Sequence, residues 1–182
     1  PLRLVGSEMC IRDRLLWIDI IMDGPPALTL GLEKGGNEVL NYKPVRRTDG
    51  IITPRMLFKI AAQGLFMATL IVLEYLFDFL KAGRELVPTT LFCMFVIFQL
   101  FNAFNCRDLT GESIFRSAGK NKIMTAVFAA TFAFQIVITR FLGGFFKTEP
   151  LSLVLWLKII GVCFTCVIFS ESYKLAFRLS RK

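Results

Sequence analysis

Two aspartates four residues apart lie in an apolar stretch, and this pair constrains the chain more than any other feature. The stretch reads Leu15-Leu16-Trp17-Ile18-Asp19-Ile20-Ile21-Met22-Asp23-Gly24-Pro25-Pro26-Ala27-Leu28. A spacing of i,i+4 places Asp19 and Asp23 on one face of a helix. Each carboxylate costs about 2.5–3.5 kcal/mol at the centre of a membrane helix, so such residues are rarely kept without a function. The pattern therefore predicts a helix that needs neighbouring helices, or a bound cation, beside its two acids.

A helix break is predicted at Gly24, Pro25 and Pro26, directly after the second acid. Proline has no backbone N–H, so carbonyl oxygens one turn earlier lose their hydrogen-bond donors. Two carboxylates beside unpaired carbonyls form an all-oxygen ligand set, which suits a hard cation such as calcium. Transporters often place ion sites at broken helices near the membrane midplane. The sequence thus predicts Asp19 and Asp23 as metal ligands; the alternative is a structural acid pair bonded to neighbouring helices.

The composition indicates an integral membrane protein, because 54% of the residues are hydrophobic and the mean hydropathy is +0.58. A net charge of +8 is also found in proteins that bind nucleic acid. The basic residues instead cluster between apolar runs, as the positive-inside rule expects, so we expect membrane lipid and no nucleic acid as a partner. Histidine is absent, which excludes imidazole metal sites. Cys163 and Cys166 form a CxxC inside an apolar run, which indicates helix-packing residues.

Five apolar segments predict an all-α fold, a polytopic membrane helix bundle of about five transmembrane helices. The predicted spans are about 15–32, 57–80, 88–105, 122–142 and 151–170. The linker 33–56, the loop 106–121 and the carboxy-terminal tail hold most of the Lys and Arg, which places all three in the cytoplasm. Glu74 and Asp78, near the end of the second span, are interpreted as acids at the membrane interface.

Residues 1–14 stand apart from the rest of the chain. The run from Leu4 to Arg14 resembles the translation of a transposase-type sequencing adapter, and the chain starts with Pro1 rather than methionine. We therefore interpret 1–14 as a library scar and not as native sequence; the alternative is a natural amphipathic leader. On this interpretation residues 15–182 are the tail of a longer protein.

Three blocks of the sequence resemble one known family. The block from Leu15 to Glu33 closely resembles the sixth transmembrane helix of type II P-type cation ATPases, and Tyr42-Lys43-Pro44-Val45-Arg46-Arg47 is similar to the basic linker that follows it. The run Phe95-Val96-Ile97-Phe98-Gln99-Leu100-Phe101-Asn102-Ala103-Phe104-Asn105 resembles the eighth helix of plasma-membrane-type calcium pumps. The resemblance covers essentially all of 15–182 and implies helices six to ten, the carboxy-terminal transmembrane domain of such a pump.

The resemblance implies roles for individual residues. Asp23 matches the family's aspartate that ligates the transported ion, whereas Asp19 falls where calcium pumps usually carry asparagine and sodium/potassium pumps carry aspartate. The methionine at position 22 is similar to what plasma-membrane-type pumps carry at this position, and those pumps move one calcium per cycle. Gln99 aligns with an eighth-helix glutamate of two-site pumps, so it is an accessory metal ligand or, as buried amides commonly are, a helix-packing residue. The implied transported ion is calcium, with sodium, potassium or protons as the alternative because of Asp19.

The resemblance also implies what the pump needs beyond this sequence. The family's phosphorylated aspartate lies in a DKTGT motif, and that string does not occur here. We expect ATP and magnesium to act only through the missing amino-terminal half of the pump, which is the expected protein partner, and we expect this fragment to be inactive alone. An alternative from another functional class is a stand-alone five-helix membrane protein, such as a channel subunit or an ion-binding adaptor.

Overall fold

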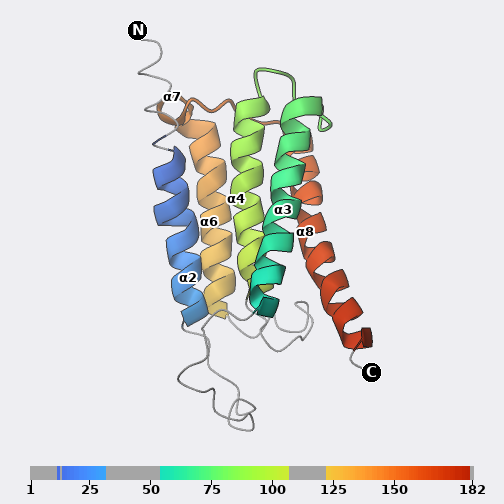
Figure 1. The fold of residues 1–182 in the computed structure, drawn as a ribbon. Coiled ribbons are helices and arrows are strands. Elements are labelled where there is room, and N and C mark those ends of the chain that lie inside the picture. Colours follow the sequence, from blue (N-terminus) through green and yellow to red (C-terminus); the bar gives the residue numbers. More distant parts are fainter. Residues whose placement is uncertain (1–11, 13, 32–53, 107–121, 181–182) are drawn as a thin grey trace.

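A computed structural model of the chain describes residues 12, 14–31, 54–106 and 122–180, and every regular element within them is helical. This confirms the predicted all-α fold. The elements are η1 (a π-helical segment, Ile18–Asp23), α2 (Gly24–Gly31), α3 (Pro54–Phe77), α4 (Val87–Cys106), α6 (Lys122–Phe141), α7 (Gly143–Phe146) and α8 (Leu153–Ser180) (Figure 1). Residues 14–17 are also helical and lead into η1.

Four of these helices are long and apolar enough to cross a membrane, and they agree with the last four predicted spans. They are Met56–Phe77, Val87–Cys106, Lys122–Phe141 and Leu153–Leu175. The first predicted span, 15–32, is not among them, because its helical residues are divided between η1 and α2. Helix α8 continues past the predicted end at 170, and the ion pair between Lys174 and Glu171 at 3.1 Å supports this extra length.

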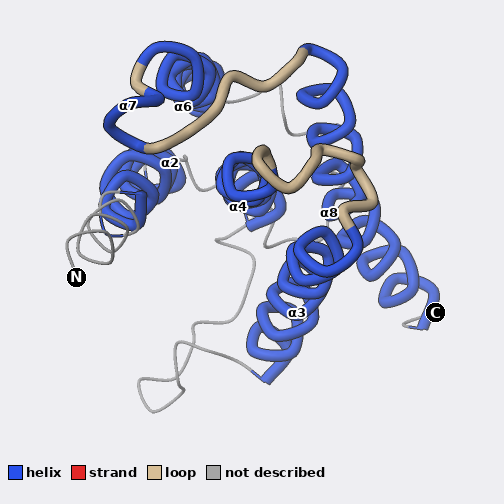
Figure 2. The backbone as a smooth tube through the Cα atoms, turned by 90° about the horizontal axis from the view of Figure 1, so that it is seen from above, coloured by secondary structure: helices blue, strands red, loops and turns tan. Residues whose placement is uncertain are grey.

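Helix α4 is the centre of the bundle. Figure 2 shows it between α2 and α6 on one side and α3 and α8 on the other, and it packs on all four helices and on η1. Its sequence is apolar around the whole helix, as a helix surrounded by others requires. Its buried apolar side chains are Phe92, Cys93, Met94, Val96, Ile97, Phe98 and Leu100.

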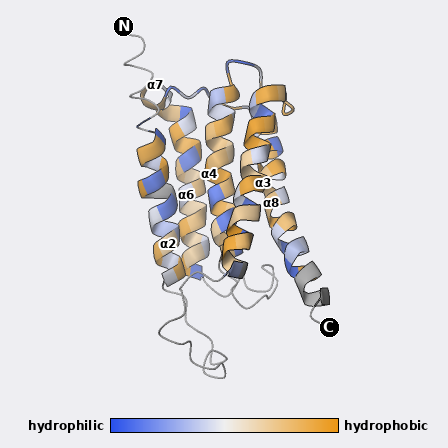
Figure 3. Cartoon of the chain, in the orientation of Figure 1, coloured by the Kyte–Doolittle hydropathy of each residue, from blue (hydrophilic) through white to orange (hydrophobic). Residues whose placement is uncertain are grey.

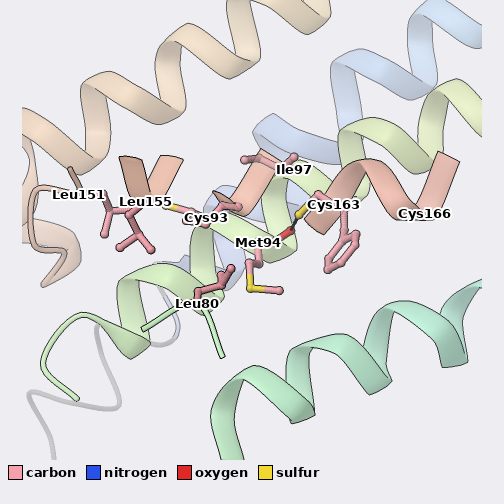
Figure 4. Close-up of a cluster of buried hydrophobic side chains, with 10 residues drawn as sticks. Leu80, Cys93, Met94, Ile97, Leu151, Leu155, Cys163 and Cys166 are labelled. Atoms are coloured by element: carbon pink, nitrogen blue, oxygen red, sulfur yellow. Dashed lines mark hydrogen bonds between the residues drawn. The ribbon is translucent and has the colours of Figure 1, made fainter. Parts of the chain in front are cut away.

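The main core lies between α4 and α8, and Figure 4 shows its side chains. Cys163 and Cys166 are buried in this cluster as free thiols, which confirms their interpretation as packing residues. The Cys163 thiol donates a hydrogen bond to the carbonyl oxygen of Met94 at 3.6 Å. Leu80, from the α3–α4 turn, also belongs to the cluster, so the turn is held against the bundle.

Large apolar side chains cover the outer surface of the bundle, and Figure 3 shows how apolar the long helices are along their length. On α3 the exposed ones include Leu57, Phe58, Leu65, Leu76 and Phe77. Apolar surface of this extent indicates contact with lipid or with other helices. The chain is thus an integral, multi-pass membrane protein.

Several predictions concern residues that the structure does not describe. Most of the linker 33–56 and of the loop 106–121 lies outside the described residues, so the cytoplasmic placement of the carboxy terminus stays a prediction. Of the proposed scar 1–14, only Arg12 and Arg14 are described. The Arg14 guanidinium donates to the carbonyl oxygens of Phe146 at 2.8 Å and Lys147 at 2.6 Å, beside the start of the first helical stretch.

Candidate functional site

Segment η1 is held against the bundle by two apolar residues at its start. Ile18 is only 7% exposed and packs on Phe92 and Val96 of α4. Trp17 lies against Phe134 of α6, with 6.0 Å between the ring centroids. Because these contacts set the rotation of the helix about its axis, they also decide which side chains of η1 remain outside the packed face.

The two carboxylates lie outside that packed face. Asp19 is in the first turn of η1 and Asp23 is its last residue, and both side chains are exposed. The sequence-predicted pair is therefore on one short segment, with neither acid buried among the described helices. Two like charges in an apolar membrane segment need a cation or hydrogen-bond donors beside them.

The predicted break at Gly24, Pro25 and Pro26 takes the form of a change in helix type rather than an end of the helix. The backbone is π-helical over Ile18–Asp23, and α2 begins at Gly24 with φ −60° and ψ −66°. Both prolines thus lie inside a continuous helical run, where they have no N–H to donate to the carbonyl oxygens about one turn earlier in η1. The irregularity falls one turn earlier, in the segment that carries the acids. Single π-helical turns inside α-helices are frequent at functional sites.

Helix α2 is fixed by a buried face of its own. Pro26 and Thr29 are buried, and the Thr29 hydroxyl donates to the Pro26 carbonyl oxygen at 2.7 Å. Gly24, in contrast, has open space beside it, since a Cβ there would meet nothing within 4 Å. Neither its backbone angles nor its described neighbours require glycine, so Gly24 leaves free room next to Asp23.

The described residues supply only part of a metal site. Within 12, 14–31, 54–106 and 122–180, no three Cys, Asp or Glu side chains come together in a way that could hold a metal ion. Calcium takes about six to eight oxygen ligands. Asp19 and Asp23 would need further ligands from carbonyl groups, water or other helices, so the arrangement fits a site shared with more protein.

Gln99 lies in a different place from the two acids. It is half-buried and lines a cavity of about 310 Å³ between α3 and α4, together with Gln63 and Asn102. None of the described residues of η1 or α2 lines this cavity. Two other amides make interhelical contacts to α8. Gln63 donates to the Cys166 sulfur at 3.3 Å, and Asn105 donates to the Cys166 carbonyl oxygen at 3.5 Å.

Glu74, in the last turn of α3, and Asp78, directly after α3, both bond to the turn that leads to α4, and their placement at the membrane interface stays a prediction. The Glu74 side chain is 0% exposed, and its Oε2 accepts a hydrogen bond from the Leu80 N–H at 3.1 Å. Lys158 of α8 donates to the Leu80 carbonyl oxygen at 2.7 Å. Asp78 instead shapes the turn, where its carboxylate accepts from the N–H groups of Ala82 and Gly83. The burial of Glu74 could have been predicted from the sequence, because this acid falls inside an apolar run.

Comparison with known proteins gives a consistent result over nearly the whole chain. A family model described as "Cation transporting ATPase, C-terminus" matches residues 14–176. The chain is 34% identical over 177 residues to the probable calcium-transporting ATPase 6, plasma membrane-type, of Oryza sativa subsp. japonica, covering 94% of this chain and 17% of that protein. It is 36% identical over 165 residues to the probable calcium-transporting ATPase 9, plasma membrane-type, of the same organism, covering 87% and 16%.

A relative from a second plant has the same relation to the chain. Calcium-transporting ATPase 12, plasma membrane-type, of Arabidopsis thaliana is 33% identical over 152 residues, covering 82% of this chain and 14% of that protein. The chain therefore spans 14% to 17% of the length of these three relatives.

Proposed function

The chain belongs to the family of cation-transporting ATPase carboxy-terminal regions, and we propose that it is the carboxy-terminal membrane region of a calcium-transporting P-type ATPase. Calcium is then the transported substrate, and Asp19 and Asp23 contribute to its site within the membrane. The names of the plasma-membrane-type relatives support calcium as the ion.

One observation carries the assignment of the site: two exposed carboxylates on a π-helical turn whose other face is packed on α4 and α6. Burial of Ile18 prevents the helix from rotating its acids into the described bundle. If Asp19 and Asp23 faced lipid, the free energy of membrane insertion would be less favourable by about 5–7 kcal/mol, twice the value for one carboxylate. In the intact protein, further helices and a bound cation would remove this cost. Gly24 leaves room for such a neighbour.

The remaining helices have a supporting role in this proposal. Helix α4 contacts η1, α2, α3, α6 and α8, so it positions the acidic segment relative to the rest of the bundle. ATP and magnesium would act through the missing amino-terminal half, which is also the protein partner, and the fragment would not hydrolyse ATP alone. In this proposal membrane lipid surrounds the bundle, and the carboxy terminus is cytoplasmic. Gln99 serves helix packing rather than ion binding.

Asp19 favours a second candidate within the same superfamily. The resemblance places an asparagine there in calcium pumps and an aspartate in sodium/potassium pumps, so a sodium, potassium or proton pump is the alternative. A stand-alone five-helix membrane protein is the candidate from another class, and the family match over 14–176 supports it less.

The reading frame and the ion dependence of the intact protein test these candidates. We would sequence the genomic locus upstream of the codon for Leu15 and express the complete reading frame. A frame that continues into a DKTGT motif, with phosphoenzyme formed from ATP only when calcium is present, is the expected result. Phosphoenzyme that requires sodium or potassium instead would move the assignment to the second candidate. A stop codon and a local start codon would support a stand-alone membrane protein.

A further inference from the structure

A groove on the membrane-facing surface lies between α6 and α8. Both helices pack on α4, but among the described residues the backbones of α6 and α8 come close to each other at very few positions. Figure 2 shows the two helices apart, joined at one end of the bundle by the connection that follows α7. The groove therefore has α6 and α8 as its walls and α4 as its floor.

Two cavities occupy this groove. One, of about 400 Å³, lies toward the α7 end and is lined by residues of α6 and α8 and by Pro150 and Leu151 of the connection. The other, of about 360 Å³, lies further along and reaches Phe101 and Phe104 of α4. Phe132 and Ile160 line both cavities, so the two adjoin and form one elongated path.

The lining of the path is apolar along most of its length and cationic at one end. The second cavity is lined almost wholly by aliphatic and aromatic side chains. At the α7 end lie Arg140, an exposed residue in the last turn of α6, and Trp156, which makes an edge contact with Phe132 at 5.9 Å. Tryptophan is enriched at membrane interfaces, and the arginine guanidinium forms charge-assisted hydrogen bonds with phosphate groups.

We propose that this groove binds one phospholipid, with an acyl chain between α6 and α8 and the phosphate on Arg140. The pattern of charge matches that molecule, because an apolar slot ends at a cation in the interface region. The size also fits a chain of methylene groups. A further transmembrane helix would not fit in the groove. Such a helix is about 10–12 Å wide over about 30 Å of membrane, so its volume is several times larger than that of these cavities. The proposal is independent of the ion that the protein transports.

Photolabelling of the complete 182-residue chain in lipid nanodiscs tests the proposal. The probe is a phosphatidylcholine with a diazirine in its acyl chain, and mass spectrometry maps the labelled residues. We expect labelling concentrated on groove residues of α6 and α8. Ala129, an exposed small residue that lines the groove, is the position to fill. Ala129→Trp should remove most of this labelling, whereas Ala130→Trp, also exposed on α6 but outside both cavities, should not.

A second pair of variants tests the head-group contact without filling the groove. Arg140→Gln should lower labelling about two- to fivefold, as expected for loss of one exposed ionic contact. Arg84→Gln removes an exposed cation from the α3–α4 turn, at the same end of the bundle, and should have no effect. Unchanged protection of the buried thiols Cys93 and Cys163 from a thiol reagent would show that each variant is folded.

Three results would overturn the proposal. Labelling spread evenly over all membrane-facing helices would show that the groove holds no particular lipid. Equal labelling of the Ala129→Trp and Ala130→Trp chains would place the bound lipid elsewhere. A dimer in which the groove residues crosslink to a second copy, in place of the lipid probe, would assign the groove to that copy.

Discussion

Replacing Gly143 by alanine should destabilise the connection between α6 and α8, whereas the same change at Gly144 should not. A Cβ at position 143 would lie 2.5 Å from the carbonyl oxygen of Thr148. The Thr148 N–H also donates to the Gly143 carbonyl oxygen at 3.1 Å, so the two backbones are held together. Since the clash is with backbone, no side-chain rotation relieves it. A Cβ at Gly144 would meet nothing within 4 Å.

The expected magnitude follows from these contacts. Forcing one methyl group into a packed site costs about 1–3 kcal/mol. Where the new side chain has room, replacing glycine by alanine instead stabilises by about 0.4–1 kcal/mol through the unfolded chain. Gly143→Ala should therefore be less stable than the parent chain, and Gly144→Ala equally or more stable.

A thermal ramp in detergent with a thiol-reactive fluorophore measures this difference. Cys93, Cys163 and Cys166 are free and buried, so the dye reaches them only as the bundle unfolds. We expect a lower transition midpoint for Gly143→Ala than for the parent chain and for Gly144→Ala. Equal midpoints for the two variants would refute the packing of the connection described here.

Three further predictions address the core, the α3–α4 turn and the acid pair. Phe98 is 2% exposed, so Phe98→Ala should lower the free energy of unfolding by about 3–5 kcal/mol and lower the midpoint of the same thermal assay. Phe77→Ala, at a side chain 71% exposed, should change the midpoint little. Asp78→Ala removes the acceptor of two N–H groups and should cost about 1–3 kcal/mol; Asp78→Asn should cost less, because asparagine keeps an acceptor and tolerates the φ of 45° found there. We also hypothesise that protons compete with the transported cation for the acid pair Asp19 and Asp23, so that the entering cation displaces a proton from the site. Calcium affinity of the intact pump should then fall as pH is lowered, and less so in Asp19→Asn; the same pH dependence in both proteins would reject the hypothesis.

The long helices were predictable because their cause is local. Runs of about twenty apolar residues between basic loops define spans in any membrane protein, and Pro54 and Pro88 mark helix starts where a missing N–H is tolerated. Hydropathy predicted the end of α8 less well, because the helix continues through a polar segment that the Glu171–Lys174 pair supports.

The details of the candidate site were less predictable, because they depend on neighbours distant in sequence. The spacing of Asp19 and Asp23 identified the pair, but the packing of Trp17 and Ile18 on other helices decides which way it faces. The prolines predicted an irregularity, yet the backbone accommodates it as a π-helical turn before them. Likewise, only the folded α3–α4 turn brings the Leu80 N–H to Glu74 and makes a buried acid acceptable.

The central claim is that Asp19 and Asp23 bind the transported calcium, and the calcium dependence of phosphoenzyme formation in the intact pump tests it most directly. We would compare the parent protein with Asp23→Asn, Asp19→Asn and a control, Glu85→Gln, which makes the same chemical change at an exposed acid of the α3–α4 turn. The account predicts that Asp23→Asn raises the calcium concentration for half-maximal phosphorylation strongly, that Asp19→Asn raises it less, and that Glu85→Gln leaves it unchanged. Normal calcium dependence in both aspartate variants would contradict the account and leave the pair a structural role alone.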